Sequence, residues 1–137
     1  PGDGSLITQL GHVSDLTDAM IKSFNYKNAL NNIYNCSGEK GITIKGLIFK
    51  CAEVLNLEIE NIRLIPFNYE NMDAKSRKSF PLRLNHYQTS ISKIKNDLEW
   101  KPRFDLFSGL KDSFNFDFET KMDDDFVPPN DGLLFNS

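Results

Sequence analysis

Short apolar runs alternate with longer stretches of helical periodicity along this chain. Four short runs are candidate strands, because each carries β-branched or aromatic residues and is bounded by Gly, Ser or Pro. They are residues 6–13, 32–36, 61–66 and 85–89. The candidate helices place apolar side chains on one face, and they are residues 15–26, 44–56, 90–98 and 105–116. Strands that alternate with helices are typical of α/β folds. We therefore expect an α/β domain with a small, mainly parallel sheet of short strands packed with helices.

Residues that favour helix N-termini stand at the start of each candidate helix. They are Ser14, Thr43, Ser90 and Asp105. Each has a side-chain oxygen that can accept a hydrogen bond from a backbone N–H of the first turn. Trp100 ends the third candidate helix, just before Lys101-Pro102, and we expect it in the core.

The length of 137 residues suits one domain with a real core. Apolar residues make up 39% and charged residues 26%, values that argue against disordered and fibrous classes. No apolar run approaches the roughly 20 residues that a membrane span needs. We expect a domain over residues 1–118 and an acidic tail over 119–137. The chain begins with Pro1 rather than Met, so we also expect it to be part of a longer protein.

Cysteine content indicates a reducing compartment. Cys36 and Cys51 are too few for a disulfide scaffold, and each lies in an apolar stretch. We therefore expect buried free thiols.

Charge is distributed unevenly along the sequence. Residues 67–103 carry eight Lys or Arg against four Asp or Glu, a net charge of +4. Residues 104–137 carry two against eight, a net charge of −6. A basic middle segment with interleaved aromatic residues fits a nucleic-acid-binding surface, because cations neutralise phosphates and aromatic rings stack on bases. The alternative interpretation is a solvated charged face.

Motifs for catalysis or metal binding are scarce. The sequence has no GxGxxG, P-loop or GxSxG pattern. His12 and His86 are its only histidines, and neither belongs to an HxxxH or CxxC pattern. The acidic run Asp123–Asp125 is interpreted as solvated rather than metal-binding. We expect no metal site and no catalytic residue in this chain.

A series of landmarks in order carries a family resemblance. They are Gly2-Asp3-Gly4, Gln9-Leu10-Gly11-His12-Val13, Asp15-Leu16, Tyr34-Asn35-Cys36-Ser37-Gly38, Thr43, Arg83, Ser90-x-x-Lys93, Leu98-Glu99-Trp100-Lys101-Pro102 and Gly109-Leu110. Residues 2–116 thereby resemble the C-terminal half of extended short-chain dehydrogenase/reductase proteins, the sugar-nucleotide epimerase/dehydratase group. The resemblance implies the α/β substrate-domain portion of that fold, without its Rossmann half.

Within that group the chain is most similar to chloroplast stem-loop-binding proteins and their cyanobacterial relatives. The stretches that carry this likeness are Leu10-Gly11-His12-Val13, Ser37-Gly38-Glu39-Lys40, residues 80–87 (FPLRLNHY) and Asp117-Phe118. These atypical members are associated with RNA binding, and some with endonuclease activity. The sugar-nucleotide enzymes usually read R-P-x-D where this chain has Arg83 to His86, with Leu84 in place of Pro. That departure counts against an ordinary sugar-nucleotide site.

The family's dinucleotide fingerprint and Y-x-x-x-K pair belong to its N-terminal half, and neither occurs here. The resemblance therefore implies no cofactor site in residues 1–137, with NAD(P) bound only if the N-terminal half is present. Whether the longer protein is an enzyme stays open.

Three functions remain as hypotheses. The first is RNA binding through residues that contact RNA or phosphate: Lys75, Arg77, Lys78, Arg83, His86 and Tyr87. The second is the substrate-binding half of an NAD-dependent sugar-nucleotide epimerase or dehydratase, with Arg83 as a diphosphate clamp. The third is an interaction domain without a ligand.

The resemblance also implies partners and a compartment. The missing Rossmann half would pack against this chain, so we expect exposed apolar residues in 6–13 and 15–26, or self-association that covers them. We expect no membrane partner. The implied location is the bacterial cytoplasm or the plastid stroma.

Overall fold

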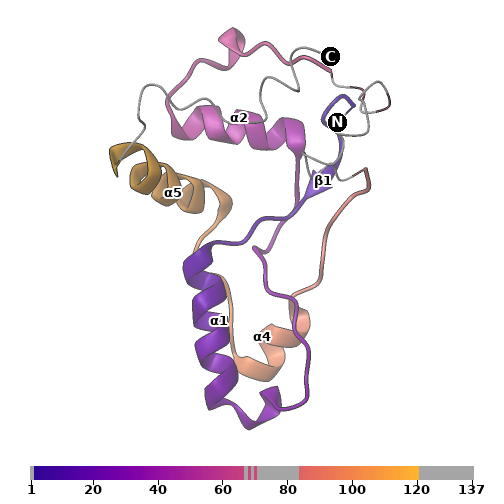
Figure 1. Ribbon diagram of the computed structural model, residues 1–137, viewed down its shortest axis with the longest axis vertical. Helices are drawn as coiled ribbons and strands as arrows, with labels where there is room; N and C mark the ends of the chain where they lie inside the picture. Colours follow the sequence, from indigo (N-terminus) through magenta and orange to yellow (C-terminus); the bar gives the residue numbers. More distant parts are fainter. Residues whose placement is uncertain (1, 67, 69, 71–83, 121–137) are drawn as a thin grey trace.

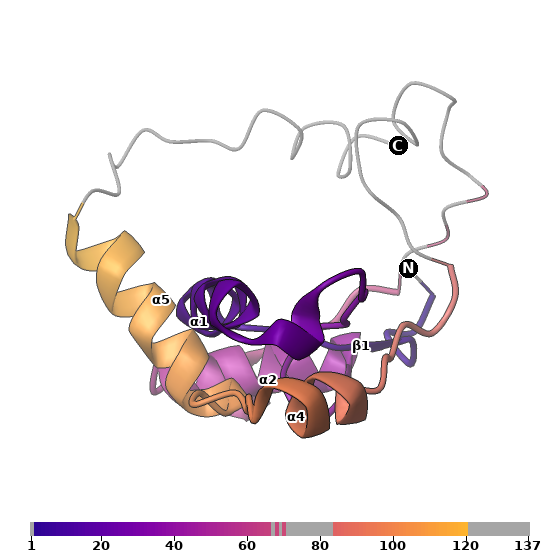
Figure 2. The ribbon, with the colours of Figure 1, turned by 90° about the horizontal axis from the view of Figure 1, so that it is seen from below.

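The computed structural model describes residues 2–66, 68, 70 and 84–120. Their elements are β1 (Ile7–Thr8), α1 (Val13–Asn25), the 3₁₀ turn η1 (Lys27–Ala29), β2 (Ile42–Thr43), α2 (Ile44–Val54), the 3₁₀ turn η2 (Ile59–Asn61), α4 (Ser92–Leu98) and α5 (Leu106–Thr120). Figure 1 shows α1 and α4 at one end of the molecule, with α2 and α5 nearer the other end. Helix α5 crosses beside the start of α1, which the view in Figure 2 also shows.

The sheet is smaller than expected and antiparallel. Strands β1 and β2 pair in register Ile7 with Thr43 and Thr8 with Ile42. The predicted parallel sheet is therefore wrong, although the α/β class is confirmed. The candidate strands at 32–36, 61–66 and 85–89 are not strands either. A strand ladder needs successive backbone hydrogen bonds. Among the residues that the structure describes, the segments at 32–38 and 85–89 make only isolated ones to the first strand region, from Gly38 N to Leu10 O and from Tyr87 N to Ile7 O.

The helices follow the predicted periodicity, but two of the predicted caps differ. Thr43 Oγ1 accepts from Gly46 N at 3.0 Å, and Asp105 Oδ1 accepts from Ser108 N at 2.8 Å, as expected. Helix α1 begins earlier than predicted, and its cap is His12 rather than Ser14. Helix α4 begins at Ser92 with Ile91 at the N-cap position, whereas the predicted cap Ser90 lies one residue earlier and its Oγ accepts from Ser92 N at 3.3 Å.

The core lies between α1 and α4. It consists of Ala19, Ile91, Ile94, Leu98 and Trp100, packed together. Trp100 is 1% exposed, which confirms its predicted place in the core. Ala19 lies on α1, whereas the other four residues lie on α4 or next to its ends. The core therefore joins the N-terminal helix to a segment about 75 residues later in the chain.

Both cysteines are free thiols, as predicted, and half-buried rather than buried. Burial raises the pKa of both the Cys36 and the Cys51 thiol, so each stays protonated at neutral pH. Among the described residues, no helix is long and apolar enough to cross a bilayer.

One side of α1 is apolar and exposed. Leu16, Met20 and Phe24 are 43%, 55% and 89% exposed, and Leu10 just before the helix is 40% exposed. The predicted exposure of this region is confirmed for these residues, whereas Leu6 and Ile7 are half-buried.

Candidate nucleic-acid interface

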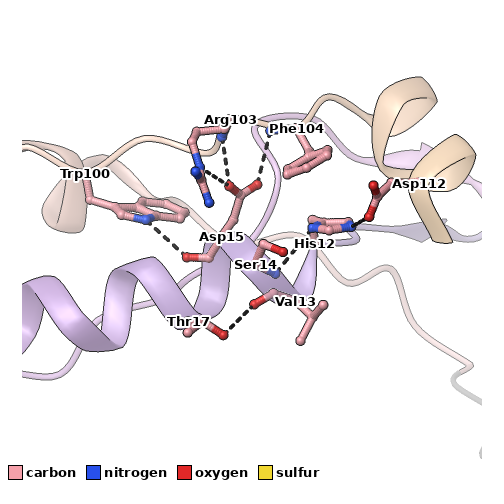
Figure 3. A network of polar contacts seen from close by, with 9 residues as sticks. All are labelled: His12, Val13, Ser14, Asp15, Thr17, Trp100, Arg103, Phe104 and Asp112. Carbon is pink, nitrogen blue, oxygen red and sulfur yellow. Dashed lines mark hydrogen bonds and ion pairs between the residues drawn. The ribbon is translucent and has the colours of Figure 1, made fainter. Parts of the chain in front are cut away.

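A buried carboxylate at the start of α1 holds the segment that follows Trp100 (Figure 3). Asp15 is 2% exposed. Its Oδ1 accepts from Arg103 N at 3.0 Å and its Oδ2 accepts from Phe104 N at 3.2 Å. Trp100 Nε1 donates to the backbone oxygen of Asp15 at 3.2 Å. Two separate landmarks of the sequence, His12 to Asp15 and Trp100 to Pro102, therefore belong to one contact in the structure.

His12 extends this contact to α5. Its Nδ1 accepts from Ser14 N at 3.3 Å, so the neutral ring carries its proton on Nε2. Nε2 then donates to Asp112 Oδ2 at 3.1 Å. The ring also stacks on Phe104 with centroids 3.9 Å apart, as Figure 3 shows. His12 thus orients α5 against the start of α1.

Gln9 links the segments on either side of the first strand. The side chain is 6% exposed. Nε2 donates to Gly38 O at 2.6 Å, and Oε1 accepts from Thr89 N at 2.7 Å. One amide therefore replaces the ladder bonds that a further strand would supply. Sequence reasoning missed this residue, although a glutamine inside an apolar run was the available signal.

The predicted residues His86 and Tyr87 lie next to β1. Ile7 N donates to His86 Nδ1 at 3.0 Å, and Tyr87 N donates to Ile7 O at 2.9 Å. The bond to Nδ1 requires an unprotonated Nδ1, and the neutral ring then has its proton on Nε2. Both side chains are exposed, Tyr87 by 44%. The structure thus presents an imidazole and a phenol side by side in the chain, at the edge of β1.

The other predicted contacts, Lys75, Arg77, Lys78 and Arg83, lie outside the described residues. The structure therefore brings His86 together with Tyr87 but does not locate the basic cluster. Two further lysines of the basic segment have structural partners. Lys93 Nζ lies 4.0 Å from the centroid of the Tyr34 ring, and Lys95 Nζ pairs with Glu39 Oε1 at 2.7 Å.

Hydrogen bonds lower the pKa of two acidic side chains, Glu39 and Asp105. The hydrogen bond and charge of Lys95 hold the pKa of Glu39 below its ordinary value. In the described part of the chain, no group of three or more His, Cys, Asp or Glu is placed to hold a metal ion. Hydrogen bonds from Ser108 likewise lower the pKa of Asp105.

Comparison with known proteins gives one sequence relative and several structural ones. No protein-family model matches the chain. The chain is 41% identical over 118 residues to the chloroplast stem-loop binding protein of 41 kDa b from Arabidopsis thaliana. The match covers 86% of this chain and 31% of that protein. The chain therefore spans less than a third of the relative's length.

Solved structures that resemble it include sugar-nucleotide enzymes. A dTDP-glucose 4,6-dehydratase from Bacillus anthracis in complex with NAD has a TM-score of 0.64 and 19% identity, over 88% of this chain and 34% of that one. A UDP-glucose 4-epimerase from Thermotoga maritima with UDP-glucose has a TM-score of 0.62 and 20% identity, over 87% and 34%. These likenesses concern the fold. The expected resemblance is therefore confirmed as a likeness: the chain is similar in sequence to a chloroplast stem-loop binding protein, and its fold is similar to that of sugar-nucleotide dehydratases and epimerases.

Proposed function

We propose that this chain is the RNA-contacting part of a stem-loop-binding protein. The observation that carries the proposal is the 41% identity, over 118 residues, to a protein named for stem-loop binding. The plastid stroma is the location proposed with it, since that relative is chloroplastic.

Charge and chain position support an interface around His86 and Tyr87. The four basic candidates Lys75, Arg77, Lys78 and Arg83 lie within nine residues and immediately precede this pair. Arg and Lys neutralise phosphates, and an exposed Tyr ring offers a stacking surface for an unpaired base. The His86 Nε2–H is a further donor, because Nδ1 is bonded to Ile7 N. We propose that these six residues contact RNA.

A salt series with matched variants tests the interface. Contacts to about four phosphates of a single strand give a log–log slope of affinity against salt near −3, from about −0.7 per phosphate. Changing Lys75, Arg77 and Lys78 together to Ala flattens the slope by about two units if all three contact phosphate. The control changes Lys27, Lys45 and Lys111 to Ala, three lysines that are exposed in the structure and lie outside the basic segment.

Fluorescence anisotropy with a labelled stem-loop measures both slopes. The control variant is expected to keep the parent slope, because it removes the same net charge from elsewhere on the surface. Equal slopes for the two variants would show that Lys75, Arg77 and Lys78 do not contact phosphate. Any RNA contact would then lie outside the basic segment.

The fold favours a second function, the substrate-binding half of a sugar-nucleotide enzyme. Epimerases and dehydratases share this fold with TM-scores of 0.62 and 0.64. In that function Arg83 clamps the diphosphate, and NAD(P) binds to a further part of a longer protein. Residues 1–137 alone are then expected to bind no NAD(P), since their sequence has no glycine-rich dinucleotide fingerprint. Calorimetric titration with UDP-glucose and with NAD tests both statements.

The apolar side of α1 supports a protein partner as well. An exposed stripe that includes Phe24, 89% exposed, is typical of a surface that packs against another protein part. We propose that a further part of a longer protein covers it, and that the isolated chain self-associates there. Sedimentation of the chain and of Phe24→Asp tests this, because the substitution is expected to abolish concentration-dependent association. A parent chain that sediments as a monomer at all concentrations would contradict it.

A further inference from the structure

A pocket of about 750 Å³ lies beside the His12–Asp15 network. It is bounded by the starts of α1 and α5, by residues 38–42 and by α2. Sites for small ligands typically have volumes of about 300–1,000 Å³. The RNA candidates His86 and Tyr87 do not line this pocket, so it is separate from the proposed interface.

Three cationic side chains from separate segments line the pocket: Lys40, Lys50 and Arg103. Two of them also have carboxylate partners in the structure. Lys50 pairs with Glu53 on α2, and Arg103 Nε lies 3.6 Å from Asp15 Oδ1. Lys40 is exposed at the rim.

Two acidic side chains also line the pocket, and both are already engaged. Glu39 pairs with Lys95, and Asp105 Oδ1 accepts from Ser108 N and Ser108 Oγ. The positive ends of two helix dipoles add to the cations, because the first residues of α1 and α5 both line the pocket. The three lining cations exceed the two lining carboxylates by one charge, so the lining is weakly positive and favours an anion over a cation.

Much of the remaining lining is apolar. Leu10, Ile42, Pro102, Phe104, Phe107 and Leu110 contribute to it. Phe104 is fixed in place, because its ring stacks on His12 and its N–H is bonded to Asp15 (Figure 3). A ligand that fits this lining has an anionic group for the cations and a flat or apolar body for these side chains.

We infer that this pocket binds a small phosphate ester with an aromatic or apolar body, of the class of nucleoside monophosphates. The anionic group lies near Lys40, Lys50 and Arg103, and the body contacts Leu10 and Phe104. Guanidinium and ammonium groups hold phosphate through charge-assisted hydrogen bonds, which are stronger than neutral ones.

Amide NMR titration with AMP tests the site. Shifts are expected at residues 38–42 and 102–107, and they are expected to saturate. Adenosine and inorganic phosphate, each of which supplies one half of the ligand, are expected to bind at least about tenfold more weakly than AMP, a difference of about 1.4 kcal/mol per tenfold.

Matched variants distinguish the pocket from general attraction of anions. Lys40→Gln with Lys50→Gln removes two lining cations and is expected to weaken AMP binding about tenfold or more. Lys27→Gln with Lys45→Gln removes the same charge from outside the pocket and is expected to leave binding unchanged. An amide spectrum of each variant verifies its fold before the titration.

The same titration separates the two sources of such a group. If a 5′-phosphorylated oligonucleotide displaces AMP and its 5′-hydroxyl counterpart does not, the natural ligand is an RNA end. If neither oligonucleotide displaces AMP, the natural ligand is a free nucleotide. Absence of saturable AMP shifts, or equal weakening by both variants, would overturn the proposal. The Lys75, Arg77 and Lys78 variant is expected to keep AMP binding, so failure of the RNA proposal leaves this one testable.

Discussion

Replacing Asp15 with Asn tests how far one carboxylate holds the fold together. The two oxygens of Asp15 accept from the backbone N–H groups of Arg103 and Phe104, and the side chain is buried. Asn keeps one acceptor and places an NH₂ group against the other donor. The variant therefore loses one charge-assisted bond, weakens the other and leaves a buried N–H unpaired. We expect a loss of about 2–4 kcal/mol in the free energy of unfolding.

Urea denaturation followed by circular dichroism measures the loss. With an m value of about 1–2 kcal/mol/M, the midpoint is expected to fall by about 1–4 M while m stays unchanged. Asp18→Asn is the matched control, because Asp18 lies on the same helix and has no side-chain hydrogen bond or ion pair in the described structure. If Asp15→Asn unfolds at the same midpoint as the control, the network does not stabilise the chain as argued.

Three further substitutions test other contacts. Gln9→Leu removes both amide bonds of a buried side chain and is expected to cost about 2–4 kcal/mol in urea unfolding; a loss below about 0.5 kcal/mol would contradict the linking role. Gly38→Ala places a Cβ 2.5 Å from a backbone carbonyl oxygen, whereas at Gly109 the nearest atom is 3.5 Å away, so only the first is expected to lower the melting temperature markedly. Lys95→Met removes the partner of Glu39, and NMR titration is expected to show the Glu39 pKa rise toward its ordinary value of 4.5. In the parent, the stabilisation from this pair is present above that ordinary value and is lost as the pH falls through the lowered pKa; an unchanged pKa would refute the pairing.

Local signals in the sequence predicted the helices well. The spacing of apolar residues and the caps Thr43 and Asp105 act within a few residues, so a single sequence contains them. His12 was not predicted as a cap, because Ser14 is the more typical residue and only the placement of the imidazole next to Ser14 N decides between them.

Contacts between distant segments were not predictable in the same way. Antiparallel pairing of Ile7 with Thr43 depends on how the chain returns after α1, and no local pattern records it. The Asp15 network joins residues 88 and 89 positions apart, so its two landmarks were visible in the sequence but their contact was not. At the candidate interface, sequence reasoning identified His86 and Tyr87 but not the bond from Ile7 N that orients the imidazole.

The binding of stem-loop RNA by this chain tests the central claim most directly. Fluorescence anisotropy of a labelled stem-loop is titrated with the chain across a salt series, with and without excess UDP-glucose and NAD. We predict saturable binding, a log–log slope near −3 and no competition by either small molecule. Unchanged anisotropy at low salt, or displacement of the RNA by UDP-glucose, would contradict it.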